Sequence, residues 1–242
     1  IFMLFIFLTL YLLYNPEKIF STFSEIFNRI FKFKRLKSNI FTNSEIDQSK
    51  TIVVKGDWIM KQCVILVGGK GTRLGDLTKN MPKPMVEIDG SPFLLKLLDI
   101  VQRYGFQEIL LLASHANEVI FNYFKDFKYK GCNIKIIVEQ EPLGTGGAII
   151  NAYDSLEEIF FCLNGDSLID GNWLRLNQYL DEECNSVIAL SEISESSRYG
   201  SVTLDNGFIS NFNEKSEQVK SNLINAGIYL FKKEVFKNFT KG

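Results

Sequence analysis

The stretch "QCVILVGGKGTRLG" at residues 62–75 joins a continuous apolar run to a cluster of glycines. An apolar run of this length that ends in glycines predicts a parallel strand buried on both faces of a sheet. In α/β proteins, ligands bind outside the carboxyl ends of such strands. Residues 62–75 therefore predict both the fold class and the position of a binding site.

Strand and helix patterns alternate along the chain after this first strand. We expect strands at 108–114, 133–140 and 159–167, and helices at 92–105, 117–127 and 146–156. From residue 185 onward, short strand-like pieces predominate, and Asn206-Gly207 is a strong hairpin signal. This order predicts an α/β fold: a Rossmann-like, mixed and mainly parallel sheet with helices on both faces, followed by a more antiparallel part.

The composition bears on partners and compartment. The formal net charge is −1, so the chain lacks the basic excess that is typical of nucleic-acid-binding proteins, and no nucleic-acid partner is expected. The four cysteines are far apart and form no C-x-x-C pair, which argues against a zinc site. Reduced, buried thiols at Cys63 and Cys162 fit a reducing, cytoplasmic location.

The first 59 residues differ in character from the rest. An apolar run at 1–14, shorter than the ~20 residues that span a bilayer, is followed by a basic cluster at 32–37. One interpretation is that residues 1–37 associate with the inner face of a membrane. The other is that residues 1–59, with a polar linker from residue 38, are not native to the working domain, which spans 60–242.

The glycine-rich segment does not match the common phosphate-binding patterns. Neither the Walker A spacing nor G-x-G-x-x-G is satisfied, because Leu74 stands where the second pattern requires glycine. What remains is G-G-x-G-T-R-L followed by Pro82-Lys83-Pro84. Glycines allow backbone N–H groups to approach a triphosphate, and Arg73 and Lys83 add two cations suited to phosphate oxygens. The segment therefore predicts a triphosphate site.

These residues carry a family resemblance. The run "LVGGKGTRLGDLTKNMPKPM" at 66–85 resembles the leader segment of the sugar-1-phosphate nucleotidyltransferases, and the resemblance extends from about Met60 to the end of the chain. Within that family, "EQEPLGTGGAI" (139–149), "LNGDS" (163–167), "RYGSV" (198–202) and "LINAGIYLF" (223–231) are most similar to the D-glycero-α-D-manno-heptose 1-phosphate guanylyltransferases. The resemblance implies transfer of a nucleotidyl group from a nucleoside triphosphate, expected to be GTP, to that sugar 1-phosphate. The products are pyrophosphate and an NDP-sugar, which is used for surface polysaccharide synthesis.

The attacking oxygen in such a reaction is already an anion, so no general base is required. This suits a chain with a single histidine, in which catalysis rests on positioning and electrostatic stabilisation. Arg73 and Lys83 are expected to stabilise the charge that develops on the triphosphate. Asp166, at the end of the strand predicted at 159–167, is expected to hold Mg²⁺.

The resemblance also implies a set of binding residues. Nucleotide contacts are expected at Leu66, Gly68, Gly69, Gly71, Thr72, Gln140, Gly144 and Thr145. Sugar-phosphate contacts are expected at Tyr199, Gly200, Glu214, Lys215, Asn225 and Gly227. Family members usually supply a second metal-binding aspartate beyond the strand predicted at 223–231. The chain ends at Gly242 before any such position, so we expect it to be a fragment.

Two alternatives stay open. One is a family member that acts on a mannose, glucose or muramate 1-phosphate with another base, since base choice depends on backbone contacts around 139–147. The other is a non-catalytic nucleotide-sugar-binding protein, anchored at the membrane through residues 1–37. Assembly into a homo-oligomer is compatible with either alternative.

Overall fold

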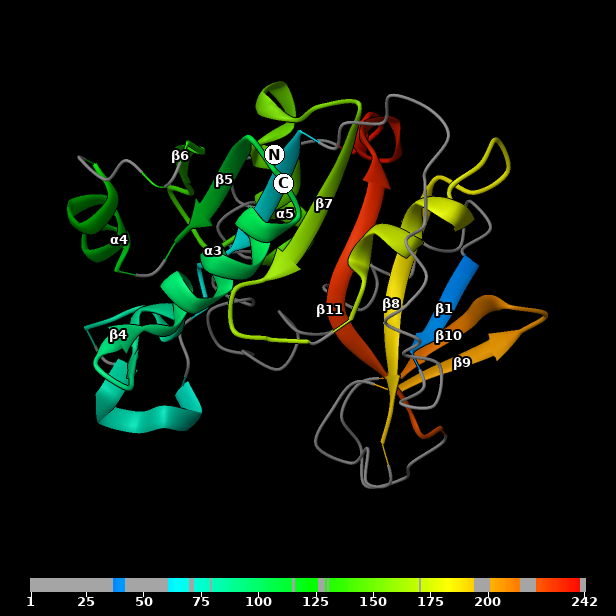
Figure 1. Ribbon diagram of the computed structural model, residues 1–242, viewed down its shortest axis with the longest axis horizontal. Helices are drawn as coiled ribbons and strands as arrows, with labels where there is room; N and C mark the ends of the chain where they lie inside the picture. Colours follow the sequence, from blue (N-terminus) through cyan, green and yellow to red (C-terminus); the bar gives the residue numbers. More distant parts are fainter. Residues whose placement is uncertain are drawn as a thin grey trace, which may run out of the picture.

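The computed structural model describes residues 37–41, 61–69, 72–78, 80–114, 116–125, 129, 131–169, 171–193, 201–213 and 221–239. Within these residues the chain forms a nine-stranded sheet in the order β6-β5-β2-β7-β11-β8-β1-β10-β9 (Figure 1). Its strands are β1 (Lys37–Phe41), β2 (Gln62–Leu66), β5 (Glu108–Ala113), β6 (Asn133–Val138), β7 (Ile159–Asn164), β8 (Ser186–Glu192), β9 (Ser201–Asp205), β10 (Phe208–Asn213) and β11 (Leu223–Lys232). A small hairpin joins β3 (Glu87–Ile88) to β4 (Ser91–Pro92).

The sheet has a parallel half and a largely antiparallel half. β6, β5, β2 and β7 run parallel, whereas β11 pairs antiparallel with both β7 and β8. β9 and β10 form the predicted hairpin, with Asp205 opposite Phe208. Asn206 and Gly207 have φ values of 50° and 80°, the left-handed conformation that a tight hairpin turn requires. The predicted mixed sheet is confirmed.

Helices cover both faces of the sheet, as predicted. The α-helices are α3 (Phe93–Arg103), α4 (Asn117–Phe124) and α5 (Gly144–Asn151). The 3-10 helices are η1 (Thr72–Thr78), η2 (Lys83–Met85), η3 (Tyr153–Ser155), η4 (Trp173–Tyr179) and η5 (Lys233–Phe236). The three α-helices agree with the predicted ranges within a few residues, whereas the 3-10 helices were not predicted from the sequence.

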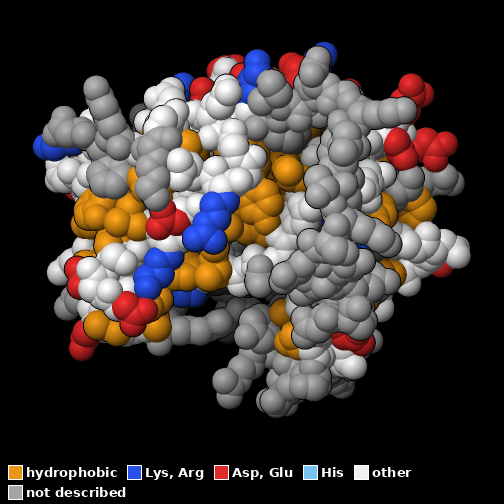
Figure 2. All heavy atoms as spheres, in the orientation of Figure 1, with side chains coloured by type: hydrophobic (Ala, Val, Ile, Leu, Met, Phe, Trp, Pro, Cys, Tyr) orange, Lys and Arg blue, Asp and Glu red, His pale blue; other side chains and the backbone are white. Residues whose placement is uncertain are grey.

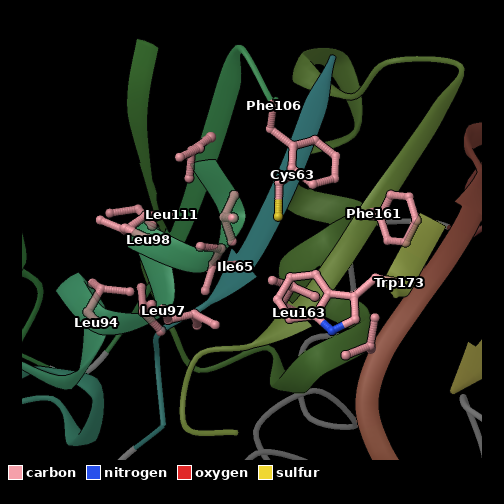
Figure 3. Packing of buried hydrophobic residues seen from close by; sticks show 14 of the residues in the cluster. Cys63, Ile65, Leu94, Leu97, Leu98, Phe106, Leu111, Phe161, Leu163 and Trp173 are labelled. Carbon is pink, nitrogen blue, oxygen red and sulfur yellow. The ribbon is translucent and has the colours of Figure 1, made fainter. Parts of the chain in front are cut away.

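Two hydrophobic clusters show which helix covers which face. Cys63 and Ile65 of β2 pack in one cluster with Leu94, Leu97 and Leu98 of α3 and with Trp173 of η4 (Figure 3). Val64 of β2 belongs to the other cluster, together with the buried residues of α5 and with Phe236 of η5. Because successive strand residues point to opposite faces, α3 and α5 lie on opposite sides of the sheet.

β1 lies in the segment that was predicted to be a linker. It pairs in parallel with β8 from Lys37 to Phe41, and Lys37 also pairs with Phe208 of β10. The rest of the linker up to Met60 and the membrane segment predicted at 1–37, except for Lys37, lie outside the described residues. Among the helices that the structure describes, none is long and apolar enough to cross a bilayer.

The cysteines that the sequence assigned to apolar strands are buried. Cys63 and Cys162 are free thiols and are completely buried, on opposite faces of the sheet. Burial raises the pKa of both thiols, so they stay protonated at neutral pH. The prediction of reduced, buried thiols at these two positions is confirmed.

The packing of α3 against the sheet yields a stability prediction. Leu98 is completely buried, so Leu98→Ala should lower the free energy of unfolding by about 2–5 kcal/mol, because it removes apolar contacts and leaves a cavity. Phe121→Ala on α4 is the matched control, since Phe121 is 52% exposed. Figure 2 shows that apolar side chains also reach the surface of the molecule. The control should change stability by less than about 0.5 kcal/mol in urea unfolding. Equal losses in the two variants would contradict the assigned packing.

Candidate functional site

The ends of β2 and β7 lie side by side and form the centre of the candidate site (Figure 1). Leu66, the last residue of β2, pairs with Asn164, the last residue of β7. The N–H of Gly165 donates a hydrogen bond of 3.0 Å to the carbonyl of Leu66 and extends this pairing beyond the strands. The chain therefore turns away from the sheet immediately before Asp166, which places the aspartate at the carboxyl edge.

Gly165 permits an approach that no other residue allows. A Cβ atom at this position would lie 2.6 Å from the carbonyl oxygen of Leu66 and 3.2 Å from Cγ of Pro84. The first contact is with backbone, which cannot move aside without breaking the strand pairing. The absence of a side chain at Gly165 therefore lets β2, β7 and the Pro82-Lys83-Pro84 segment meet at one point.

Lys83 and Asp166 form an ion pair at this meeting point. The Lys83 Nζ lies 2.6 Å from Oδ2 of Asp166, and the side chains are 38% and 41% exposed. η2 fixes the lysine backbone, because Pro84 and Met85 are buried beside it. A pair with this exposure contributes only about 0–1 kcal/mol to stability, so both charges stay available to a ligand. The sequence had assigned these two residues to one reaction centre, and the structure brings them together.

A second part of the site is the turn between β6 and α5. Glu139 is buried, and its Oε2 accepts a hydrogen bond of 2.9 Å from the N–H of Leu143. Burial raises the pKa of this carboxyl group, and the bond from Leu143 opposes the shift. Gln140 is exposed next to it, and Gly144 begins α5 with a φ of 71°. The carboxylate of Glu139 thus holds the turn that was predicted to contact the base.

Glu139 was not predicted as a site residue, although it lies within the run 139–149 that carries the resemblance. The strand predicted at 133–140 included Glu139, whereas β6 ends at Val138 and leaves Glu139 directly after the strand. An acidic residue directly after a strand lies at the carboxyl edge of the sheet, where a carboxylate can hold a following turn or a ligand. The resemblance pointed to the adjacent Gln140 instead, whose side chain is exposed.

The remaining predicted nucleotide residues take different places. Gly68 follows β2, and a Cβ atom there would lie 2.8 Å from Cβ of Ser114 at the end of β5. Gly69 is exposed, and no atom lies within 4 Å of a Cβ built on it. Thr145 is half-buried in the first turn of α5. Gly68 thus supports the close packing of the strand ends, while Gly69 leaves open space beside them.

The side chains of several predicted site residues are not described by the structure. Of Thr72 and Arg73 only the backbone is described, in η1, and Gly71, Tyr199, Gly200, Glu214 and Lys215 lie outside the described residues. The role of Arg73 opposite Asp166 therefore stays a prediction. Asn225 and Gly227 are described, in an irregular part of β11 beside Asn164.

The ability of the site to hold a metal ion rests on Asp166. Among the described residues, no group of three or more His, Cys, Asp or Glu side chains comes together as a metal cage. Mg²⁺ does not need such a cage, because it is commonly held by one or two carboxylates together with phosphate oxygens of the substrate and water. An exposed carboxylate at the edge of the sheet fits this requirement.

The tight contact at Gly165 can be tested by adding one methyl group. Gly165→Ala should lower the free energy of unfolding by about 1–3 kcal/mol, because the new Cβ overlaps the carbonyl of Leu66. Gly69→Ala is the matched control and should leave stability within about 0.5 kcal/mol, since its Cβ enters open space. Urea unfolding measures both. A Gly165→Ala protein as stable as the wild type would show that β2 and β7 do not approach this closely.

Comparison with known proteins identifies the family of this chain. The family model described as "Nucleotidyl transferase" matches residues 62–241. A D-glycero-α-D-manno-heptose 1-phosphate guanylyltransferase of Campylobacter jejuni is 40% identical over 181 residues, which cover 74% of this chain and 79% of that protein. The catalytic subunit beta of a Drosophila melanogaster mannose-1-phosphate guanylyltransferase is 39% identical over 183 residues, covering 72% of this chain and 49% of that protein.

A solved structure is also similar. The crystal structure of HddC from Yersinia pseudotuberculosis complexed with GMP-PN is 35% identical, with a TM-score of 0.65, and the match covers 74% of this chain and 80% of that one. The family model, the identity of the relatives and the shared fold confirm the resemblance that residues 66–85 predicted. The chain belongs to the nucleotidyl transferase family, whose members pass a nucleotidyl group to a sugar 1-phosphate.

Proposed function

We propose that this protein transfers GMP from GTP to D-glycero-α-D-manno-heptose 1-phosphate, and so supplies a GDP-activated heptose for surface polysaccharide. The observation that carries the proposal is the exposed pair of Lys83 and Asp166 at the joined ends of β2 and β7, which sets a cation and a metal-binding carboxylate at one point. The 40% identity to a protein named for this reaction supports the choice of substrates.

The proposed reaction is an in-line displacement at phosphorus. An oxygen of the sugar 1-phosphate forms a bond to the α-phosphorus of GTP, while the bond from that phosphorus to the oxygen bridging to the β-phosphate breaks. Pyrophosphate leaves with the electron pair of that bond, and no proton has to be moved. Lys83 and Arg73 stabilise the negative charge on the phosphate oxygens, and the glycines after β2 donate backbone N–H groups to them.

Members of the family generally use a divalent metal ion, and we propose Mg²⁺ for this protein. Asp166 would hold the ion, since its carboxylate is exposed at the carboxyl edge. When bound, Mg²⁺ would neutralise charge on the phosphate oxygens. In the structure Lys83 is paired with the same carboxylate. When the ion binds Asp166, the ammonium group of Lys83 would be released and would turn toward the phosphate oxygens.

The turn that follows β6 supports GTP as the nucleotide. Guanine carries neighbouring donors at N1 and N2, and a carboxylate can accept from both. The carboxylate of Glu139 accepts one hydrogen bond, from Leu143, which leaves acceptor capacity, and Gln140 is exposed beside it. We propose that these two residues read the base.

The domain boundary and location complete the proposal. The family model begins at residue 62, which supports a nucleotidyl transferase domain that starts near Met60. β1 adds a strand from the preceding segment to the same sheet. We propose a cytoplasmic enzyme, with residues 1–37 as the candidate for contact with a membrane.

The proposed substrates can be tested with a panel of nucleoside triphosphates and sugar 1-phosphates. Pyrophosphate release should be fastest with GTP and the heptose 1-phosphate, and kcat/KM should fall by at least about tenfold with ATP or UTP, because they lack the neighbouring donors of guanine. Faster release with mannose 1-phosphate would favour the activity named for the Drosophila relative. If the protein binds nucleotide but releases no pyrophosphate with any pair of nucleoside triphosphate and sugar 1-phosphate, an enzymatic role is contradicted.

The base-reading role of Glu139 yields a separate prediction. Glu139→Gln keeps the size of the side chain but replaces one acceptor oxygen with a donor, so kcat/KM for GTP should fall by about 10–100-fold relative to that for UTP. Glu141→Gln, an exposed position in the same turn, is the matched control and should leave this ratio unchanged. Steady-state kinetics with both nucleotides measures the ratio. An unchanged ratio in Glu139→Gln would reject base recognition by this residue.

A further inference from the structure

β11 contains an irregularity beside the candidate site. Asn225 pairs with Leu190 of β8 and Tyr229 with Ile188, so β11 advances four residues while β8 advances two. Gly227 lies in this bulge with a φ of 77°, in the left-handed region that favours glycine. A Cβ atom at Gly227 would lie 2.8 Å from Nδ2 of Asn164, so the bulge packs directly against the end of β7. Bulges of this kind are enriched next to active sites, where they redirect side chains.

One side chain spans the bulge from its first residue to its last. The Oδ1 of Asn225 accepts a hydrogen bond of 2.8 Å from the N–H of Gly227. The Nδ2 of the same amide donates a hydrogen bond of 2.6 Å to the hydroxyl oxygen of Tyr229. Both ends of the amide are therefore held, which fixes its orientation. One N–H of Nδ2 and one lone pair of Oδ1 remain for a ligand.

The hydroxyl of Tyr229 joins this bulge to β7. Tyr229 is 3% exposed, and its hydroxyl oxygen also interacts with the side chain of Asn164. Burial raises the pKa of the phenol, while the hydrogen bonds from Asn225 and Asn164 oppose the shift, so the hydroxyl stays protonated. The same group feels the charge of Asp166. Tyr229 thus connects a residue predicted to contact the sugar phosphate with the strand end that leads to Asp166.

Packing does not require the hydroxyl. The ring of Tyr229 stacks on that of Phe231, with centroids 5.6 Å apart, in a cluster that also contains Phe160 and Phe236. Phenylalanine at position 229 would preserve these apolar contacts. A buried hydroxyl is unfavourable unless it is hydrogen-bonded, so its use here lies in the two amides that it orients.

We propose that Tyr229 is a positioning residue for the acceptor sugar phosphate, acting through the amides of Asn225 and Asn164. The inference rests on the proposed function, because it assigns Asn225 to the sugar-phosphate pocket. Tyr229 contacts neither substrate. Its hydroxyl holds the amide of Asn225 in one orientation for the sugar phosphate and ties β11 to the end of β7, which leads to Asp166.

The test is steady-state pyrophosphate release by wild-type protein and Tyr229→Phe. The variant should raise KM for the sugar 1-phosphate by about tenfold, with KM for GTP changed by less than about twofold, because only the sugar side loses its oriented amide. Tyr129→Phe is the matched control, since it also removes a buried phenol contact, to Asp99 of α3, in the cluster on the opposite face of the sheet. Both variants should lower the thermal midpoint by about 2–4 °C, and only Tyr229→Phe should change KM for the sugar.

A double variant separates positioning from a general loss of structure. If Tyr229 acts through Asn225, then Asn225→Ala should raise KM for the sugar 1-phosphate in the wild type but add less than about twofold in the Tyr229→Phe background. An unchanged sugar KM in Tyr229→Phe, a matching rise in the Tyr129→Phe control, or additive effects in the double variant would each overturn the inference. Wild-type protein that releases no pyrophosphate with any sugar phosphate would reject the proposed function, and the inference with it. An active wild type with one of the three preceding results would reject the inference alone.

Discussion

The site depends on the backbone contact between the ends of β2 and β7. The N–H of Gly165 reaches the carbonyl of Leu66 at 3.0 Å, a distance at which any side chain on Gly165 would collide with that oxygen. Because this contact closes the end of the sheet, Asp166 emerges at its carboxyl edge. The same close approach brings Pro84 against the turn and places Lys83 beside the aspartate. Because Gly165 has no side chain, the backbone can bring Lys83 and Asp166 into contact.

The arrangement explains how a nearly neutral chain can handle highly charged substrates. The formal net charge is −1, so no long-range field gathers phosphates. Charge is instead concentrated at Lys83 and Asp166, where partial exposure keeps the pair weak and exchangeable. Rigid supports lie along the same edge of the sheet as this pair. Buried Pro84 and Met85 hold the lysine, the carboxylate of Glu139 holds the neighbouring turn, and the amide of Asn225 holds the bulge of β11.

The elements predicted correctly are those whose sequence carries a strong local pattern. β2, β5 and β7 are continuous apolar runs, α3 has a regular apolar stripe, and Asn206-Gly207 encodes its own turn. The 3-10 helices and β1 carry no such pattern. β1 has the sequence KSNIF and is a strand because β8 and β10 lie on either side of it. Short elements of this kind take their conformation from their neighbours, so local propensity does not reveal them.

The sequence alone determined the family, the α/β sheet and the assignment of Lys83 and Asp166 to one reaction, because glycines, prolines and charges in a fixed order are local chemical signals. Tertiary structure decided which of two adjacent side chains turns inward, as at Glu139 and Gln140, and it linked Tyr229 to Asn164 and Asn225. The contact of Tyr229 with Asn164 joins β11 and β7, which are distant along the chain. This contact and the inward orientation of Glu139 exist only after the strands have paired, since orientation and burial are properties of the packed sheet.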